Sequence, residues 1–125
     1  MVLQAHDEFT LDYTVTSNGS ALLEESVTGE IEMLSIFNFQ NDELLLTHYC
    51  GLQNKPISKL TGNNEGVLSF ATDSQMSGLT LEKDTYVTSW EINLSPEDEN
   101  QMMYKYTVSG PEGDVFTATS TLSRI

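Results

Sequence analysis

The sequence predicts an all-β protein that folds as one domain over residues 1–125. Hydrophobic and polar residues alternate at every second position through most of the chain, which is typical of half-buried strands. Gly, Asn, Asp and Pro separate these segments at short, regular intervals, and no segment keeps a helical period over three turns. About nine short strands joined by tight turns favour an antiparallel barrel or sandwich.

The first half of the chain alternates most clearly. Residues from Phe9 to Val15 predict the first strand, and Asn18-Gly19 then suits a hairpin turn because both residue types tolerate positive φ. Gly29 and the pair Asn41-Asp42 end the next two alternating segments. The strands after the first are expected over residues 21–28, 30–39, 43–50 and 56–60.

The second half repeats the pattern with longer connections. Turn residues gather at Gly62–Gly66 and again at Gly110–Gly113. Residues 95–100 begin Ser-Pro-Glu-Asp, which is typical of a helix start, so a capped helical turn or an open loop is expected there. Strands are expected over residues 67–71, 86–92, 102–108 and 116–122, with a weaker strand over 77–82.

The charge balance excludes two classes of partner. Nineteen Asp and Glu residues stand against five Lys and Arg, which gives a net charge of −14. Nucleic acid and anionic membrane surfaces both require clustered cations, and the sequence has no such cluster. We therefore expect no nucleic acid and no membrane among the partners.

The chain also carries the features of a cytoplasmic protein. No apolar run approaches the roughly 18 residues that span a bilayer, and the N-terminus lacks the basic start and apolar stretch of a secretory signal. The single cysteine forbids an internal disulfide, which agrees with a reducing compartment.

One segment stands out for its chemistry and for a family resemblance. Leu44–Cys50 holds the only cysteine and one of two histidines, and Asn54-Lys55-Pro56 follows. This pattern resembles the signature of the bacterial lipocalin-like domains of unknown function, the DUF1579 type. Further segments resemble strands of the same family: Gly19–Glu24, Glu32–Phe37, Trp90 and Thr119–Arg124.

The resemblance implies a lipocalin-like, up-and-down antiparallel β-barrel of about nine strands. Family members usually begin with an extra strand carrying Leu-x-Gly-x-Trp, which this chain lacks, and Gln75-Met76-Ser77 replaces their His-Met-His. Met1–Glu8 is too short and too polar to replace a strand of about 9 residues. A missing strand would leave an open sheet edge, so a homodimer is expected to cover it near residues 8–16.

Glu24 and His48 are the candidates for interior chemistry. Glu24 and Glu25 face opposite sides of a strand, so one of them must point into the barrel, where a carboxylate needs a partner. An interior Glu24 beside His48 would stabilise both groups and could bind a ligand hydroxyl or act as a general base. The alternatives are a solvated Glu24 and a His48 that is satisfied by core hydrogen bonds.

Cys50 lies two residues from His48, so the two side chains share a face at a Cα distance of roughly 7 Å. That spacing does not give the contact of a catalytic Cys–His pair, and Cys50 is expected to be a small buried hydrophobe or a pocket-lining thiol. Neither a zinc ligand set nor a phosphate-binding loop is present, so no cofactor is expected. Five aromatic residues are expected to fill the barrel or line a cavity: Phe37, Tyr49, Trp90, Tyr104 and Tyr106.

These features predict a protein that holds a small, largely apolar molecule inside a barrel. One alternative is an enzyme that uses Glu24, His48 and Tyr49 for proton transfer on an apolar substrate. Another is a structural or interaction module whose interior is packed solid. The size of any interior cavity distinguishes this last alternative from the other two.

Overall fold

The computed structural model describes residues 1–6, 8–94 and 98–125, and these residues form a closed antiparallel barrel of ten strands. Each strand pairs with its neighbours in sequence, and β1 pairs with β10 to close the ring, which is an up-and-down order. The predicted all-β barrel is confirmed, with one strand more than expected. The strands are β1 (Val2–His6), β2 (Phe9–Thr16), β3 (Ala21–Thr28), β4 (Ile31–Gln40), β5 (Glu43–Tyr49), β6 (Ile57–Asn64), β7 (Val67–Thr72), β8 (Tyr86–Asn93), β9 (Gln101–Gly110) and β10 (Gly113–Arg124).

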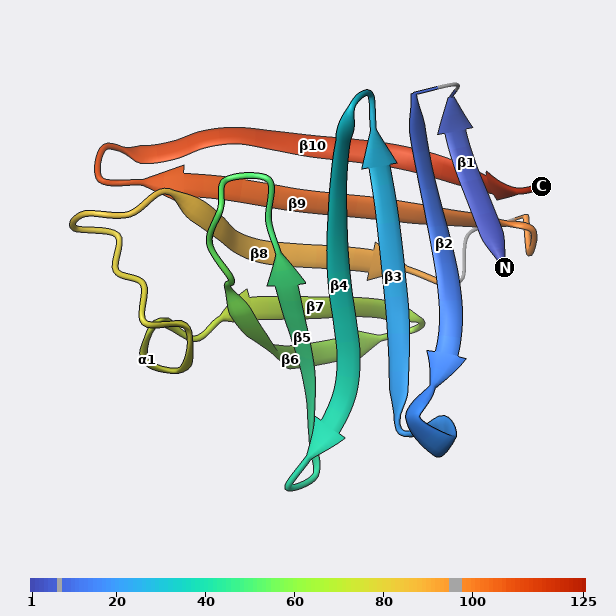
Figure 1. Ribbon diagram of the computed structural model, residues 1–125, viewed down its shortest axis with the longest axis horizontal. Coiled ribbons are helices and arrows are strands. Elements are labelled where there is room, and N and C mark those ends of the chain that lie inside the picture. Colours follow the sequence, from blue (N-terminus) through green and yellow to red (C-terminus); the bar gives the residue numbers. More distant parts are fainter. Residues whose placement is uncertain (7, 95–97) are drawn as a thin grey trace.

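The barrel is flattened into two faces whose strands cross steeply (Figure 1). Strands β2 to β5 make one face, and β7 to β10 make the other. Crossed packing of this kind brings side chains from the two faces together in the interior. Residues far apart in sequence, on β3 and β9 for example, therefore meet inside the barrel.

Tight turns sit where the sequence predicts them. Asn18 and Gly19, in a 3₁₀ turn over Ser17–Gly19, have φ values of 58° and 84°. Asn41 and Asp42 form a two-residue hairpin turn with φ values of 51° and 64°. Because only residues that tolerate positive φ fit such turns, these positions set the register between the strands they join.

The N-terminal segment differs from the prediction. Val2–His6 forms β1, which pairs with both β2 and β10, so the barrel closes within one chain. Leu3 provides the physical reason, because it is the buried residue of this short strand and lies opposite Leu11. The expected gap near residues 8–16 is absent from the described residues, and the argument for a homodimer loses its premise.

A second difference concerns residues 77–82, which do not form the expected strand. The four-residue helix α1 (Ser74–Ser77) ends at Gly78, whose φ of 69° is left-handed. The Asp73 carboxylate begins the helix by accepting a hydrogen bond from the Met76 N–H at 2.9 Å. Of the turn expected over residues 95–100, positions 95–97 lie outside the described residues.

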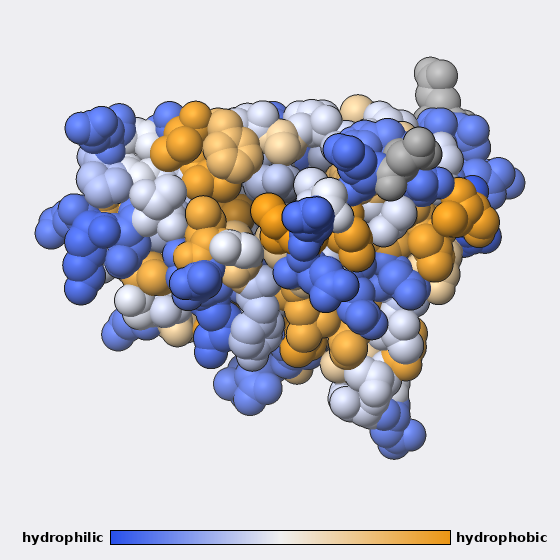
Figure 2. Space-filling model, turned by 45° about the horizontal axis from the view of Figure 1, so that its top comes forward, coloured by the Kyte–Doolittle hydropathy of each residue, from blue (hydrophilic) through white to orange (hydrophobic). Residues whose placement is uncertain are grey.

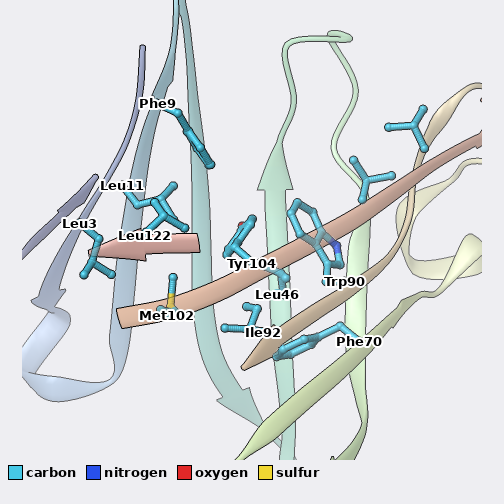
Figure 3. Close-up of a cluster of buried hydrophobic side chains, with 12 residues drawn as sticks. Leu3, Phe9, Leu11, Leu46, Phe70, Trp90, Ile92, Met102, Tyr104 and Leu122 are labelled. Atoms are coloured by element: carbon cyan, nitrogen blue, oxygen red, sulfur yellow. The ribbon is translucent and has the colours of Figure 1, made fainter. Parts of the chain in front are cut away.

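The core lies where the two faces meet. Figure 3 shows Leu3, Leu11, Leu122 and Met102 gathered where β1, β2, β9 and β10 close the ring. Leu11 and Leu122 are fully buried, and each such side chain contributes about 1.5–3 kcal/mol to stability. A second part of the core gathers around Trp90 at the centre of the barrel.

The outer surface mixes hydrophobic and hydrophilic residues. Figure 2 shows one face on which orange, hydrophobic groups lie between blue, hydrophilic ones. Isolated exposed apolar residues of this kind are ordinary on protein surfaces. No helix among the described residues has the length and hydropathy that a membrane crossing requires.

Candidate functional site

The barrel interior holds two chambers, one towards each end. Chamber 1 has a volume of about 460 Å³ and lies beside the turn between β2 and β3. Chamber 2 has a volume of about 230 Å³ and lies beside the turn that joins β3 to β4 and the loop that follows β5. Both volumes far exceed the roughly 10–15 Å³ that a cavity needs to hold one water molecule.

Chamber 1 is almost entirely apolar. Phe37, Leu44, Leu68 and Ile92 are among the residues that line it. Phe37 meets Phe70 edge-on, with ring centroids 6.0 Å apart. The sequence-based prediction that Phe37 lines a cavity agrees with this position, although Phe37 is not part of chamber 2.

A row of polar side chains crosses the interior between the two chambers. Strand pairing places Tyr13 opposite Glu24, Glu24 opposite Ser35, and Ser35 opposite His48. The four residues therefore lie side by side on the inward face of β2 to β5. This lateral alignment follows from register, which spacing along the sequence does not reveal.

Glu24 is the centre of this row and is only 2% exposed. The Tyr13 hydroxyl donates to Oε2 at 2.7 Å, and the Tyr104 hydroxyl donates to Oε1 at 2.8 Å from the opposite wall. Burial raises the pKa of Glu24, while hydrogen bonds from Tyr13, Tyr104 and Ser35 act to lower it. Of the two positions that the sequence leaves open for Glu24, the structure has the interior one, with tyrosine hydroxyls as its main partners.

The two tyrosines are affected in turn. Burial raises the pKa of Tyr13 and of Tyr104, and the neighbouring Glu24 carboxylate raises both further. Both hydroxyls therefore stay protonated and remain hydrogen-bond donors at neutral pH.

His48 is buried and faces chamber 2. Its Nδ1 lies 2.8 Å from Oγ of Ser35, and burial lowers its pKa to about 4. The imidazole is consequently neutral at pH 7. No ion pair joins Glu24 and His48 within the described residues, because Ser35 stands between them. The predicted proximity of the two groups is found, but their direct pairing is not.

Trp90 packs at the centre of an aromatic cluster beside chamber 2 (Figure 3). Its ring centroid lies 4.9 Å from that of His48, 5.9 Å from that of Tyr104 and 5.6 Å from that of Tyr106. Its Nε1 is fully buried and has no hydrogen-bond partner among the described residues. An unpaired buried donor is uncommon in folded proteins and asks for an explanation.

Cys50 and Tyr49 separate at the end of β5. Cys50 is a free thiol that lines chamber 2, and burial raises its pKa, so the unreactive thiol form prevails at neutral pH. Tyr49 is 47% exposed and lies on the outer surface beside Lys55. The inclusion of Tyr49 in the cavity was wrong, because adjacent strand residues point to opposite faces.

Most of the polar and aromatic residues of the interior were predicted from the sequence, and two were not. Glu24, His48, Cys50, Trp90, Tyr104 and Tyr106 all line chamber 2. Tyr13 and Ser35 were missed as polar partners, although both share the inward parity of their strands. Among the described residues, no three His, Cys, Asp or Glu side chains gather closely enough to hold a metal ion.

Comparison of this chain with protein-family models, with curated proteins and with solved structures finds no match. The resemblance to the lipocalin-like domains therefore stays a prediction. The function must be argued from the two chambers and the polar row between them.

Proposed function

We propose that this protein binds a small, largely apolar molecule in the barrel interior. The observation that carries the proposal is the pair of chambers, of about 460 and 230 Å³, in a closed ten-stranded barrel. About eight strands already make an interior that side chains just fill or that holds one small ligand. A wider ring with unfilled chambers supports ligand binding over a solid, purely structural interior.

The walls suit a molecule with a long apolar part. Chamber 1 offers aromatic and aliphatic side chains, and its volume falls within the range of about 300–1,000 Å³ that is usual for ligand pockets. Several apolar residues that line the chambers are also exposed to solvent. They form an apolar surface that leads from the outside of the barrel into each chamber. They are Val15, Phe39 and Leu94 for chamber 1, and Ile31, Leu52 and Phe116 for chamber 2.

An enzyme that transfers protons is the less favoured alternative. Glu24 and His48 are buried titratable groups on one chamber, which is typical of catalytic sites. However, both oxygens of Glu24 already accept hydrogen bonds from tyrosines, and the low pKa of His48, about 4, makes it a weak base. With Tyr49 on the outer surface, the set supports holding a ligand more than reacting with it. A cytoplasmic location, expected from the sequence, is part of the same proposal.

The test uses Trp90, the only tryptophan, which is 4% exposed and touches chamber 2. Uncharged terpenoids, aromatics and alkyl chains are titrated while tryptophan emission and the melting temperature are recorded. We expect saturable changes in emission and a higher melting temperature, because a ligand that binds only the folded state stabilises it. If the whole set leaves both signals unchanged, the proposal is wrong.

Two substitutions locate the bound molecule. Leu22→Phe adds volume to the wall of chamber 1, and Ser26→Leu does the same in chamber 2. The variant that fills the occupied chamber should lose affinity, while the other variant keeps it. Val115→Leu, at an exposed position outside both chambers, serves as the control for added volume.

A further inference from the structure

Chamber 2 contains a buried side chain, His48, whose hydrogen bonding is incomplete among the described residues. Within the described residues, the His48 imidazole makes one hydrogen bond, through Nδ1 to Ser35, which leaves Nε2 to a molecule in the chamber. The Trp90 ring packs edge to face against the imidazole, with ring centroids 4.9 Å apart. Nε2 of His48 is therefore a polar atom of this wall that a bound molecule can pair with.

Ser35 determines which role His48 takes. Its hydroxyl lies between Glu24 and His48 in the strand register, and it has one proton to donate. Ser35 lies directly opposite Glu24, whose two oxygens both accept hydrogen bonds, so the Ser35 proton is directed to that carboxyl group. Oγ of Ser35 then accepts from Nδ1–H of His48, and Nε2 is left without a proton. A molecule in chamber 2 meets Nε2 as an acceptor.

The charge around chamber 2 selects against acids. No Lys or Arg lines it among the described residues, and Glu24 is the one buried carboxyl group in its wall. An anionic ligand would enter a low-dielectric space beside a carboxyl group with no cation to pair with it. The net charge of −14 opposes its approach as well.

We infer that chamber 2 takes an uncharged apolar molecule with a hydroxyl group, whose O–H donates to Nε2 of His48. The ligand class is thus an apolar alcohol or phenol. This inference rests on the proposed function, since it presupposes that the interior binds a ligand.

The test compares four molecules of nearly the same shape by isothermal titration calorimetry at pH 7: naphthol, its methyl ether, methylnaphthalene and naphthoate. Naphthol should bind at least about tenfold more tightly than the ether, because only naphthol can donate to Nε2. Naphthoate should bind most weakly.

Two changes to the protein identify the recognising groups. His48→Phe keeps a planar ring but removes the acceptor nitrogen. Naphthol and its ether should then bind this variant about equally, and methylnaphthalene should still bind. Ser35→Ala, a smaller change that frees the imidazole tautomer, should reduce the preference partly. His6→Phe, at an exposed histidine, is the control and should leave the preference unchanged.

The outcomes separate the two proposals. If none of the four molecules binds and the wider set of apolar probes is also silent, the proposed function fails and the inference fails with it. If the molecules bind but naphthol is not preferred, or naphthoate binds most tightly, the inference alone is overturned. A preference for naphthol that survives both His48→Phe and Ser35→Ala would also overturn it, because another group would then be the acceptor.

Discussion

Glu24 and Tyr104 stand 80 positions apart in the chain and meet across the barrel, with Oη of Tyr104 donating to Oε1 of Glu24 at 2.8 Å. The bond joins β3 to β9, which lie on opposite faces of the barrel (Figure 1). It closes the polar row between the two chambers and gives a buried carboxyl group a partner that it requires.

Tyr104→Phe should therefore lower the free energy of unfolding by about 1.5–3 kcal/mol, the usual value of a hydrogen bond to a charged group. Urea denaturation measures this change. Tyr106→Phe is the matched control, because the Tyr106 hydroxyl lines chamber 2 without a hydrogen bond within the described residues, and it should cost less than about 1 kcal/mol. Equal losses in the two variants would mean that the bond to Glu24 contributes nothing specific.

Glu24→Gln should change how stability depends on pH. Because the pKa of Glu24 is raised in the folded state, the unfolded chain ionises first as pH rises above about 4.5. The free energy of unfolding of the wild-type protein therefore includes a contribution from protonated Glu24. This contribution is present at low pH and is lost as pH rises through the folded pKa of Glu24. The stability of the variant relative to wild type should thus increase with pH, by at most about 1.4 kcal/mol per unit.

Urea denaturation from pH 4 to pH 8 measures the difference. Glu25→Gln removes the same charge from the exposed face of the strand and is the control. A flat difference between Glu24→Gln and wild type would contradict the raised pKa. Loss of ligand affinity in this variant without loss of folding would place the carboxyl group in the binding site.

His48 should make the protein sensitive to acid. Burial lowers its pKa from 6.5 to about 4, so the unfolded chain takes up a proton before the folded protein does. Neutral His48 therefore contributes to the free energy of unfolding above pH 6.5. This contribution, about 3 kcal/mol in total, is lost as pH falls towards 4. His48→Gln should lose less stability than wild type over this range, whereas His6→Gln should behave as wild type. Parallel curves for all three proteins would show that His48 is not the group responsible.

Leu3→Ala should weaken the closure of the barrel. Leu3 is 4% exposed and packs where β1 joins β2 and β10, so its truncation should cost about 2–4 kcal/mol. Gln4→Ala, on the opposite face of the same strand, should have a much smaller effect. Thermal and urea unfolding compare the two variants, and equal effects would mean that β1 contributes little to the closed ring.

The local pattern of the chain determined most of the strands by itself. Alternation and turn residues predicted β2 to β5 almost to the residue, because a strand with one buried face must alternate and a two-residue turn must tolerate positive φ. The same parity argument correctly opposed Glu24 to Glu25. The local pattern gave the wrong prediction at two places. Residues 77–82 have the apolar residues of a weak strand but form none, and Met1–Glu8, which is short and polar, contains β1.

Only the tertiary structure decided which face of each strand points inward and what it meets there. The side of Glu24 depends on the register of β3 against β2 and β4, and its partner Tyr104 depends on how the second face of the barrel crosses the first. Tyr49 and His48 are neighbours in sequence, yet one lies outside and the other inside. Closure of the ring fixes such relationships through contacts between distant strands, which a local sequence pattern does not specify.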